Sequence, residues 1–246
     1  MPEFISAGVR LHYALAGPAD GRPIVLGHGF CSDYSLNWIG TRWQETLTGA
    51  GFHVIGLDSR GHGVSAKPHD PAAYSRPEMA ADVTRLLDEL GLQAADYLGY
   101  SMGARIGLEL LQRFPERVRR AVLGGLNSSD DFERARLIAR RFRGDGAVTD
   151  PVAVSFFSFA SARSVNDLEA LACCILGDQP PLQEVALRRI AVKALLVAGD
   201  RDPLAAEAES IAALIPNASY VELQGRDHMS SVPARAFKEA ALAFLS

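Results

Sequence analysis

Short, continuously apolar runs alternate with longer amphipathic stretches along most of this 246-residue chain. Apolar runs of this length, bounded by turn residues, predict strands buried on both faces, as in parallel sheets. We expect these strands at 24–27, 53–57, 97–99, 121–123, 194–197 and 219–223. Apolar residues at helical spacing predict helices at about 36–49, 78–90, 103–113, 205–214 and 234–245. The alternation predicts an α/β fold with a mostly parallel, doubly wound sheet that binds ligands at the carboxyl ends of its strands.

Two segments depart from this alternation. Residues 3–16 alternate between apolar and polar positions, which predicts a β-hairpin with its turn at Ala7-Gly8. Residues 130–185 are helical in pattern and contain no convincing strand. A single crossover rarely needs about 55 residues. We therefore expect a small helical cap at 130–185 inserted into an α/β core formed by 1–129 and 186–246, with ordinary crossover helices as the alternative.

The segment Gly99-Tyr100-Ser101-Met102-Gly103 lies between a predicted strand and a predicted helix. In that setting Gly-x-Ser-x-Gly places the serine on a sharp strand-to-helix turn, where the glycines let neighbouring backbone pass closely. The N-terminus of the helix supplies free N–H groups and a positive dipole where an oxyanion would form. A helix N-cap serine between flexible glycines is the purely structural alternative. We predict that Ser101 is a nucleophile.

Around this segment the chain resembles the α/β-hydrolase superfamily, and the resemblance extends over most of its length. Five stretches in the family's order carry it: His28-Gly29-Phe30, the segment 58–65 that reads DSRGHGVS, Gly99–Gly103, Gly199-Asp200-Arg201-Asp202-Pro203, and Gly225-Arg226-Asp227-His228. The resemblance implies the α/β-hydrolase fold and a catalytic triad in the order serine, acid, histidine.

A serine hydroxyl needs a base to take its proton, and the chain has six histidines. His228 follows the last predicted strand, at the same sheet edge as Ser101, and it holds the position of the family's catalytic histidine. The resemblance gives His28 and His62 structural roles in their own loops. The other three histidines (His12, His53 and His69) lie outside any motif.

The acid that orients the histidine is expected to be Asp202. In the family this aspartate usually comes three residues after the glycine that closes the strand, here Gly199. Asp200 is the competing carboxylate and would otherwise serve as a loop or capping residue. Some members of the superfamily take the acid from the loop after an earlier strand, and Asp130 could serve in that way here.

The resemblance implies an oxyanion hole made by the backbone amides of Phe30 and Met102. Phe30, Tyr100 and Trp38 are the predicted substrate-binding residues, with Cys31 and Tyr34 as further candidates for the same wall. Aromatic and aliphatic residues of the expected cap could form an apolar roof or could simply pack on the core. They are Phe156, Phe157, Phe159, Leu171 and Ile175.

Composition and charge narrow the class of partner. With 48% hydrophobic residues and a formal net charge of −4, the chain suits a single globular protein and offers no basic stripe for nucleic acid. It has no apolar stretch long enough to cross a bilayer. Its three cysteines include the adjacent pair Cys173-Cys174, which is a poor disulfide framework and lacks partners for a metal site. We expect a cytoplasmic monomer or homodimer without metal or cofactor, acting on a small-molecule ester or acyl substrate.

Within the family the sequence favours a serine carboxylesterase-like hydrolase that acts through an acyl-enzyme. Epoxide hydrolases and haloalkane dehalogenases use an aspartate where this chain has Ser101. Carbon–carbon bond hydrolases and enol-lactonases of ring-cleavage products remain alternatives, because they also keep serine followed by methionine. Arg105, in the first turn of the helix after Ser101, opposes the helix dipole and so either pairs with an acid or binds an anion, such as a substrate carboxylate. A triad-retaining small-molecule receptor is the non-enzymatic alternative.

Overall fold

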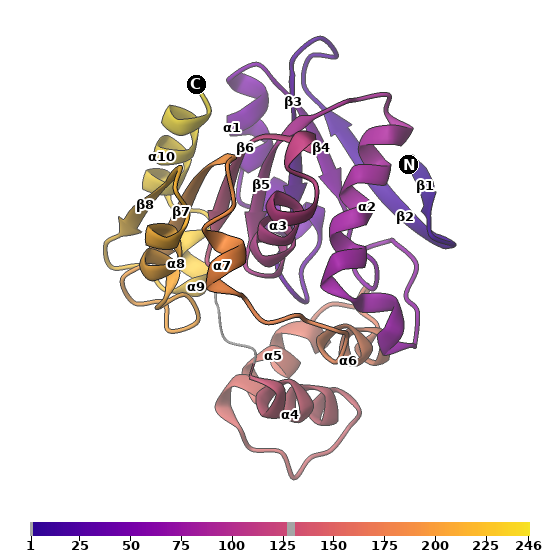
Figure 1. The fold of residues 1–246 in the computed structure, drawn as a ribbon. Coiled ribbons are helices and arrows are strands. Elements are labelled where there is room, and N and C mark those ends of the chain that lie inside the picture. The colour runs from indigo at the N-terminus through magenta and orange to yellow at the C-terminus, as the bar shows by residue number, and fades with distance from the viewer. Residues whose placement is uncertain (1, 127–130) are drawn as a thin grey trace.

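The computed structural model describes residues 2–126 and 131–246, and in these residues a single eight-stranded sheet runs through the protein (Figure 1). The strand order across the sheet is β1-β2-β4-β3-β5-β6-β7-β8. The strands are β1 (Glu3–Ser6), β2 (Val9–Ala16), β3 (Arg22–Gly27), β4 (Phe52–Leu57), β5 (Ala95–Tyr100), β6 (Val118–Gly124), β7 (Lys193–Gly199) and β8 (Ala218–Leu223). All six predicted buried strands are present, and strands β3 to β8 pair in parallel. The predicted mostly parallel α/β-hydrolase fold is confirmed.

The predicted hairpin forms the start of the sheet. Strands β1 and β2 pair antiparallel, and Ala7 and Gly8 between them have φ angles of 46° and 80°. Successive residues with positive φ give the turn a twist that matches the right-handed twist of its strands. Strand β2 then pairs antiparallel with β4, which joins the hairpin to the parallel part of the sheet.

The order of the central strands determines where a ligand can bind. From β3 the chain passes to β4 on one side of it, and from β4 it crosses to β5 on the other side. The loops that leave β3 and β5 therefore diverge and open a crevice at the carboxyl ends of these strands. Gly27 and Gly99 are register partners at those ends, so the segments that follow them begin side by side.

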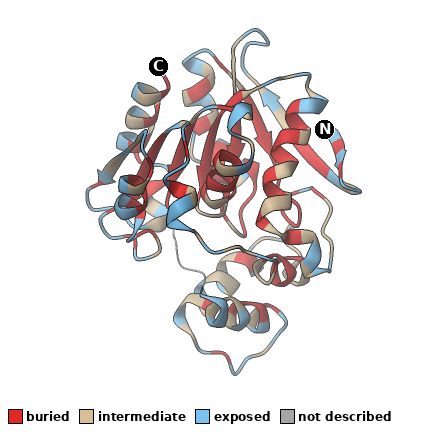
Figure 2. Ribbon diagram, in the orientation of Figure 1, coloured by how far each residue is buried: buried red, intermediate tan, exposed pale blue. Residues whose placement is uncertain are grey.

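Helices cover both faces of the sheet and enclose two apolar layers (Figures 1 and 2). One face carries α2, α3 and α8, and the other carries α1 and α10. Their bounds are α1 (Trp43–Gly49), α2 (Arg76–Glu89), α3 (Met102–Arg113), α8 (Ala208–Leu214) and α10 (Arg235–Leu245). The red strands at the centre of Figure 2 show that both faces of the middle of the sheet are buried.

Two helix predictions need correction, one for an internal break and one at its start, whereas the final helix starts within one residue of its predicted position. The helix predicted at 36–49 is divided into a π-helical turn (η1, Ser35–Ile39) and α1, because Arg42 between them has a φ angle of 64°. The helix predicted from 205 begins at Ala208, since residues 203–207 form turns. The final helix begins at Arg235, and a short helix α9 (His228–Ser231) precedes it.

Between β6 and β7 the described residues form helices and no strand, as the pattern predicts. These helices are α4 (Phe132–Phe142), α5 (Pro151–Ser161), α6 (Leu168–Ile175) and α7 (Glu184–Leu187). The first three pack together at one end of the molecule, beyond the carboxyl ends of the strands, around a buried cluster of their own (Figure 1). We refer to α4–α6 as the cap, while the domain boundaries at 129 and 186 stay a prediction. No helix in the described part of the chain is long and apolar enough to cross a membrane.

A buried ion pair joins α2 to the loop after β4. Arg60 donates to Asp82 through Nε at 2.8 Å and through Nη2 at 2.5 Å, and each side chain is only 2% exposed. The Ser6 hydroxyl also donates to this carboxylate, which ties β1 to the same pair. Removing one partner from a buried ion pair leaves the other charge uncompensated.

We therefore expect Asp82→Ala to lower the free energy of unfolding by about 3–5 kcal/mol. The measurement is urea denaturation followed by circular dichroism. Glu45→Ala is the matched control, because it removes an ion pair with Arg42 whose side chains are 72% and 66% exposed. The control should leave the urea midpoint unchanged. Equal midpoints for the two variants would show that the buried pair does not stabilise the fold.

Candidate active site

Ser101 lies at the turn between β5 and α3 in a strained backbone conformation. Its φ and ψ angles are 53° and −112°, outside the regions that side chains with a Cβ prefer. A Cβ on Gly99 would overlap the carbonyl oxygen of Gly103, and a Cβ on Gly103 would overlap that of Gly27. The glycines on either side of the serine thus let α3 start directly against the ends of β3 and β5. The Ser101 amide donates to the Gly124 carbonyl at 2.8 Å, which anchors the turn to β6.

The segment after β3 passes directly beside this turn. A Cβ on Gly29 would lie 3.6 Å from the Ser101 Cβ. The Gly29 amide donates to Asn37 Oδ1 at 3.0 Å, and His28 Nε2 accepts from the Ser59 amide at 3.0 Å. In the described part of the chain, the amides of Phe30 and Met102 donate no hydrogen bond within the protein. Both amides are therefore available to a ligand atom bound beside Ser101.

Asp202 and His228 form a hydrogen-bonded pair at the ends of β7 and β8. Asp202 Oδ2 lies 2.7 Å from His228 Nδ1. The aspartate side chain is fully buried and that of the histidine is 15% exposed. The other carboxylate oxygen of Asp202 accepts from the Leu204 amide at 3.0 Å, which fixes its orientation. Parallel pairing of β7 with β8 brings the two loops together, with Gly199 opposite Leu223.

Neighbouring residues hold His228 in place. The Tyr100 hydroxyl donates to the His228 carbonyl at 2.5 Å, and the two rings lie 5.2 Å apart. The Asp227 side chain accepts from the Met229 and Ser230 amides and so caps α9, the short helix that starts at His228. Asp200, the competing acid, instead accepts from the Arg226 amide at 3.1 Å and joins the two loops.

The other histidines with motif context, His28 and His62, lie buried in their own loops. His62 is fully buried, and burial together with the neighbouring His28 lowers its pKa to about 3. The His28 ring is also fully buried and bonds backbone groups through both nitrogens. Neither side chain lines a cavity that contains Ser101.

Ser101 and His228 line the same apolar cavity of about 480 Å³, which we call the histidine cavity. Tyr100, Phe30 and Phe156 contribute aromatic surface to its wall. Among the described residues, no hydrogen bond joins the Ser101 hydroxyl to the His228 ring. Catalytic hydrogen bonds are often long before substrate binds, so this arrangement is compatible with a nucleophile and its base.

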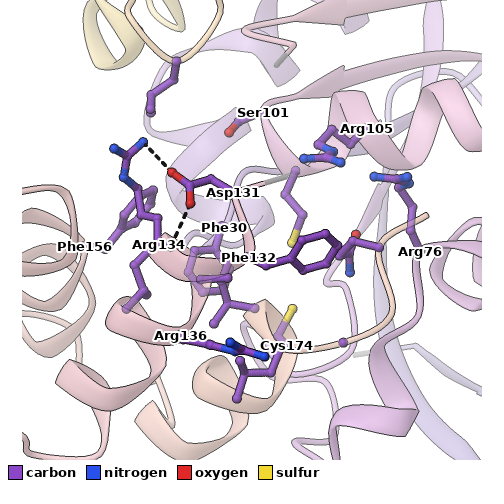
Figure 3. Close-up of a pocket in the computed structure, with 18 of the residues that line it drawn as sticks. Phe30, Arg76, Ser101, Arg105, Asp131, Phe132, Arg134, Arg136, Phe156 and Cys174 are labelled. Atoms are coloured by element: carbon purple, nitrogen blue, oxygen red, sulfur yellow. Dashed lines mark hydrogen bonds and ion pairs between the residues drawn. The ribbon is translucent and has the colours of Figure 1, made fainter. Parts of the chain in front are cut away.

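A second cavity of about 410 Å³ is also lined by Ser101, and we call it the arginine cavity (Figure 3). Four of its lining residues are Arg76, Arg105, Arg134 and Arg136. Figure 3 shows Arg105 and Arg76 on one side of it and Arg134, paired with Asp131 at 3.3 Å, on the other. Phe30, Ser101, Val152, Phe156 and Leu204 line both cavities. Ser101 thus lies where an apolar space meets one lined by arginines, of which Arg76, Arg134 and Arg136 form ion pairs with carboxylates.

Several predicted pocket residues lie elsewhere. Trp38 is fully buried and packs edge-on against Trp43 in the core, so the prediction that it contacts substrate needs correction. The π-helical turn η1 directs Leu36 and Asn37 to the histidine cavity and Trp38 inward. Cys31 and Tyr34 are also buried and line neither cavity.

The expected apolar roof is present in part. Phe156 lines both cavities, Phe159 the histidine cavity and Ile175 the arginine cavity. Leu171 is fully buried within the cap, and Phe157 packs against Phe142 instead. Other lining residues, including Leu204 and Met229, carry no sequence signal beyond their place beside a motif.

Within residues 2–126 and 131–246, no group of three or more His, Cys, Asp or Glu side chains is arranged to hold a metal ion. Asp130, the other alternative acid, lies outside the described residues.

Comparison with known proteins yields relatives that include lactonases and epoxide hydrolases. The chain is 28% identical over 221 residues to 3-oxoadipate enol-lactonase 2 of Acinetobacter baylyi, covering 82% of this chain and 79% of that protein. It is 34% identical over 116 residues to bifunctional epoxide hydrolase 2 of Sus scrofa, but that match spans only 20% of the relative's length. The crystal structure of the enol-lactonase from Burkholderia xenovorans LB400 superposes with a TM-score of 0.84, at 27% identity and 99% coverage of both chains.

The family model described as "alpha/beta hydrolase fold" matches residues 22–145. That match runs from β3 through the turn at Ser101 and into α4. Because it takes in half of the chain, and because the fold and the relatives agree with it, this protein belongs to the alpha/beta hydrolase fold family.

Proposed function

We propose that this protein is a serine hydrolase that cleaves a carboxylic ester of small or medium size through a triad of Ser101, His228 and Asp202. The main support for this proposal is the distance of 2.7 Å between Asp202 Oδ2 and His228 Nδ1. His228 in turn lines the same cavity as Ser101. A serine, a base and an orienting acid in this order constitute the machinery for acyl transfer.

In the proposed first step His228 takes the proton of the Ser101 hydroxyl as the oxygen attacks the ester carbonyl carbon. Asp202, bonded to Nδ1, keeps Nε2 available as the base and stabilises the imidazolium that forms. The C–O bond to the alcohol then breaks, and His228 returns the proton to the leaving oxygen. Ser101 is left as an acyl ester.

In the second step a water molecule attacks the acyl carbon while His228 takes its proton. Collapse of the tetrahedral intermediate releases the carboxylic acid and restores the Ser101 hydroxyl. In both steps the carbonyl oxygen becomes negatively charged. The amides of Phe30 and Met102 are the proposed donors to that oxygen, because both are adjacent to Ser101 and otherwise unused in the described residues.

The cavities favour a substrate with groups on either side of the reacting carbon. Volumes of about 480 and 410 Å³ suit small organic molecules. The aromatic wall of the histidine cavity favours an apolar group there. The two cavities meet at Ser101, so the acyl and alcohol parts can occupy separate spaces.

Ser101→Ala should lower kcat for p-nitrophenyl acetate, butyrate and octanoate by at least about 10⁴-fold, because the nucleophile is lost. Release of p-nitrophenol under steady-state conditions is the measurement, and the preferred chain length reports the pocket size. Equal rates for the mutant and the wild type would exclude Ser101 as the nucleophile. A single burst without turnover would instead favour the receptor alternative.

Asp202→Asn should lower kcat by about 10⁴-fold, because the amide favours the wrong tautomer of His228. Asp200→Asn is the matched control, since Asp200 lies in the same loop and its carboxylate accepts from the Arg226 amide. Its kcat should stay within about threefold of the wild type, as expected for a group outside the triad. A larger loss for Asp200→Asn than for Asp202→Asn, measured with p-nitrophenyl butyrate, would reverse the assignment of the acid.

A second candidate is hydrolysis of an enol-lactone, a cyclic ester, that bears a carboxylate. Two enol-lactonases are among the proteins that this chain resembles over most of its length. Arg105 lies in the first turn of α3 and lines the arginine cavity beside Ser101 (Figure 3). A guanidinium at this place can bind a substrate carboxylate.

If Arg105 binds a substrate carboxylate, Arg105→Ala should lower kcat/KM for the p-nitrophenyl monoester of glutaric acid by roughly 10- to 100-fold. For neutral p-nitrophenyl butyrate the change should be within about threefold, because that ester makes no such contact. Arg113→Ala, at the other end of α3, is the control for a change of charge on this helix. Equal losses on the charged and neutral esters would end the hypothesis.

A further inference from the structure

The loop of residues 28–33 carries the Phe30 amide in a conformation that is unfavourable by itself. We call it the oxyanion loop, in accordance with the proposed function. Cys31 has a φ angle of 61°, a region that residues with a side chain rarely adopt. Such a backbone persists only where surrounding contacts hold it. The contacts of this loop therefore determine where the Phe30 amide points.

The core holds the first half of the oxyanion loop. The Gly29 amide bonds Asn37 Oδ1, and the Gly29 carbonyl accepts from the Ser32 amide at 3.1 Å. The His28 ring bonds the Ser59 amide. The Ser32 contact closes the loop on itself, and the other two reach it from Asn37, which follows β3, and from Ser59, which follows β4.

The cap holds the second half. The Cys31 side chain is fully buried in the apolar cluster of the cap, and the Cys31 carbonyl accepts from Asn166 Nδ2 at 3.2 Å. The carboxylate of Asp33, which is 4% exposed, forms an ion pair with Arg163 through one oxygen. Its other oxygen accepts from the Leu36 amide at 2.8 Å, where η1 begins. The cap thus holds the Cys31 side chain and the Cys31 carbonyl, and it shares the Asp33 carboxylate with η1.

Arg163 and Asn166 belong to a turn that is itself anchored. This cap turn, residues 162–167, joins α5 to α6. The Asn166 amide donates to the Arg163 carbonyl at 3.1 Å, and Asn166 Nδ2 also donates to the Ala160 carbonyl at the end of α5. Asp167 accepts from the first amides of α6 at 3.0 Å. The turn can therefore transmit the position of two cap helices to the oxyanion loop.

We propose that Arg163 and Asn166 are positioning residues that hold the oxyanion loop so that the Phe30 amide points at the developing oxyanion. Docking of the cap would then complete the catalytic site as well as cover it. The inference rests on the proposed function. The inference also goes beyond the proposed function, because it gives Arg163 and Asn166 a role in the chemical step. Neither residue lines the histidine cavity or the arginine cavity.

If Arg163 and Asn166 had a purely structural role, their substitution would change the stability of the protein or its affinity for substrate. The rate of the chemical step would stay the same. The distinguishing readout is the rate at which an alkyl fluorophosphonate labels Ser101, measured by mass spectrometry of the intact protein. In this reaction His228 takes the serine proton as the serine oxygen bonds to phosphorus, fluoride leaves, and the phosphoryl oxygen gains charge in the oxyanion hole. The probe needs no knowledge of the natural substrate.

We expect Arg163→Met and Asn166→Ala each to lower the labelling rate by roughly 10-fold or more, since a misplaced donor loses much of its effect. For p-nitrophenyl butyrate, kcat should fall in the same proportion while KM stays within about twofold. Arg163→Lys should recover part of the loss by restoring the charge beside Asp33. Arg140→Met is the matched control: it removes an ion pair with Asp145 inside the cap and should label at the wild-type rate.

Circular dichroism and the melting temperature show whether each variant is folded. Asn166→Ala removes a neutral hydrogen bond and serves as the deciding variant if Arg163→Met unfolds. Wild-type labelling and kcat in a folded Asn166→Ala, or a rise in KM alone, would overturn the positioning role. If the wild type is not labelled, or Ser101→Ala is labelled equally, the proposed function fails and this inference with it.

Discussion

The close approach of α3 to the ends of β3 and β5 is the constraint on which the site depends. Gly27, Gly99 and Gly103 meet there without space for a Cβ, so the helix starts directly above the sheet. The chain must then turn through Ser101 with a positive φ, which raises its side chain out of the turn. The same contact places the segment after β3 beside the serine. Ser101 and the oxyanion loop are therefore placed by one packing requirement.

The second half of the site follows from the pairing of β7 with β8. Parallel register aligns Gly199 with Leu223, and the two following loops exchange backbone contacts through Asp200. In this arrangement Asp202 is buried against the His228 ring. Tyr100, at the end of the strand that leads to Ser101, donates its hydroxyl to the His228 carbonyl. The Tyr100 hydroxyl thus connects the two halves of the site, a role that is separate from any contact with substrate.

The sequence predicts the sheet and the motif positions because their signals are local. Apolar runs mark the strands, and glycines mark the turn at Ser101. Trp38 is a case in which the local signal is insufficient. It follows a motif, but it lies in a π-helical turn that directs its side chain into the core. Its neighbour Asn37 instead accepts a hydrogen bond from the Gly29 amide. The break of the helix at Arg42, where φ is 64°, is likewise a feature that apolar spacing does not record. Which arginines share a cavity with Ser101 depends on how the cap lies over the core.

Phe30 links the chemistry of the site to its specificity. Its amide is a proposed oxyanion donor, while its ring lies 6.0 Å from that of Phe142 in a stacked geometry and 5.5 Å from that of Phe156. The ring also lines both cavities. Repacking the cap around a different substrate must therefore shift the residue that carries the donor. A change of substrate through the cap therefore acts on the proposed donor as well as on the cavity wall, because Phe156 lines both cavities and packs against the ring of Phe30.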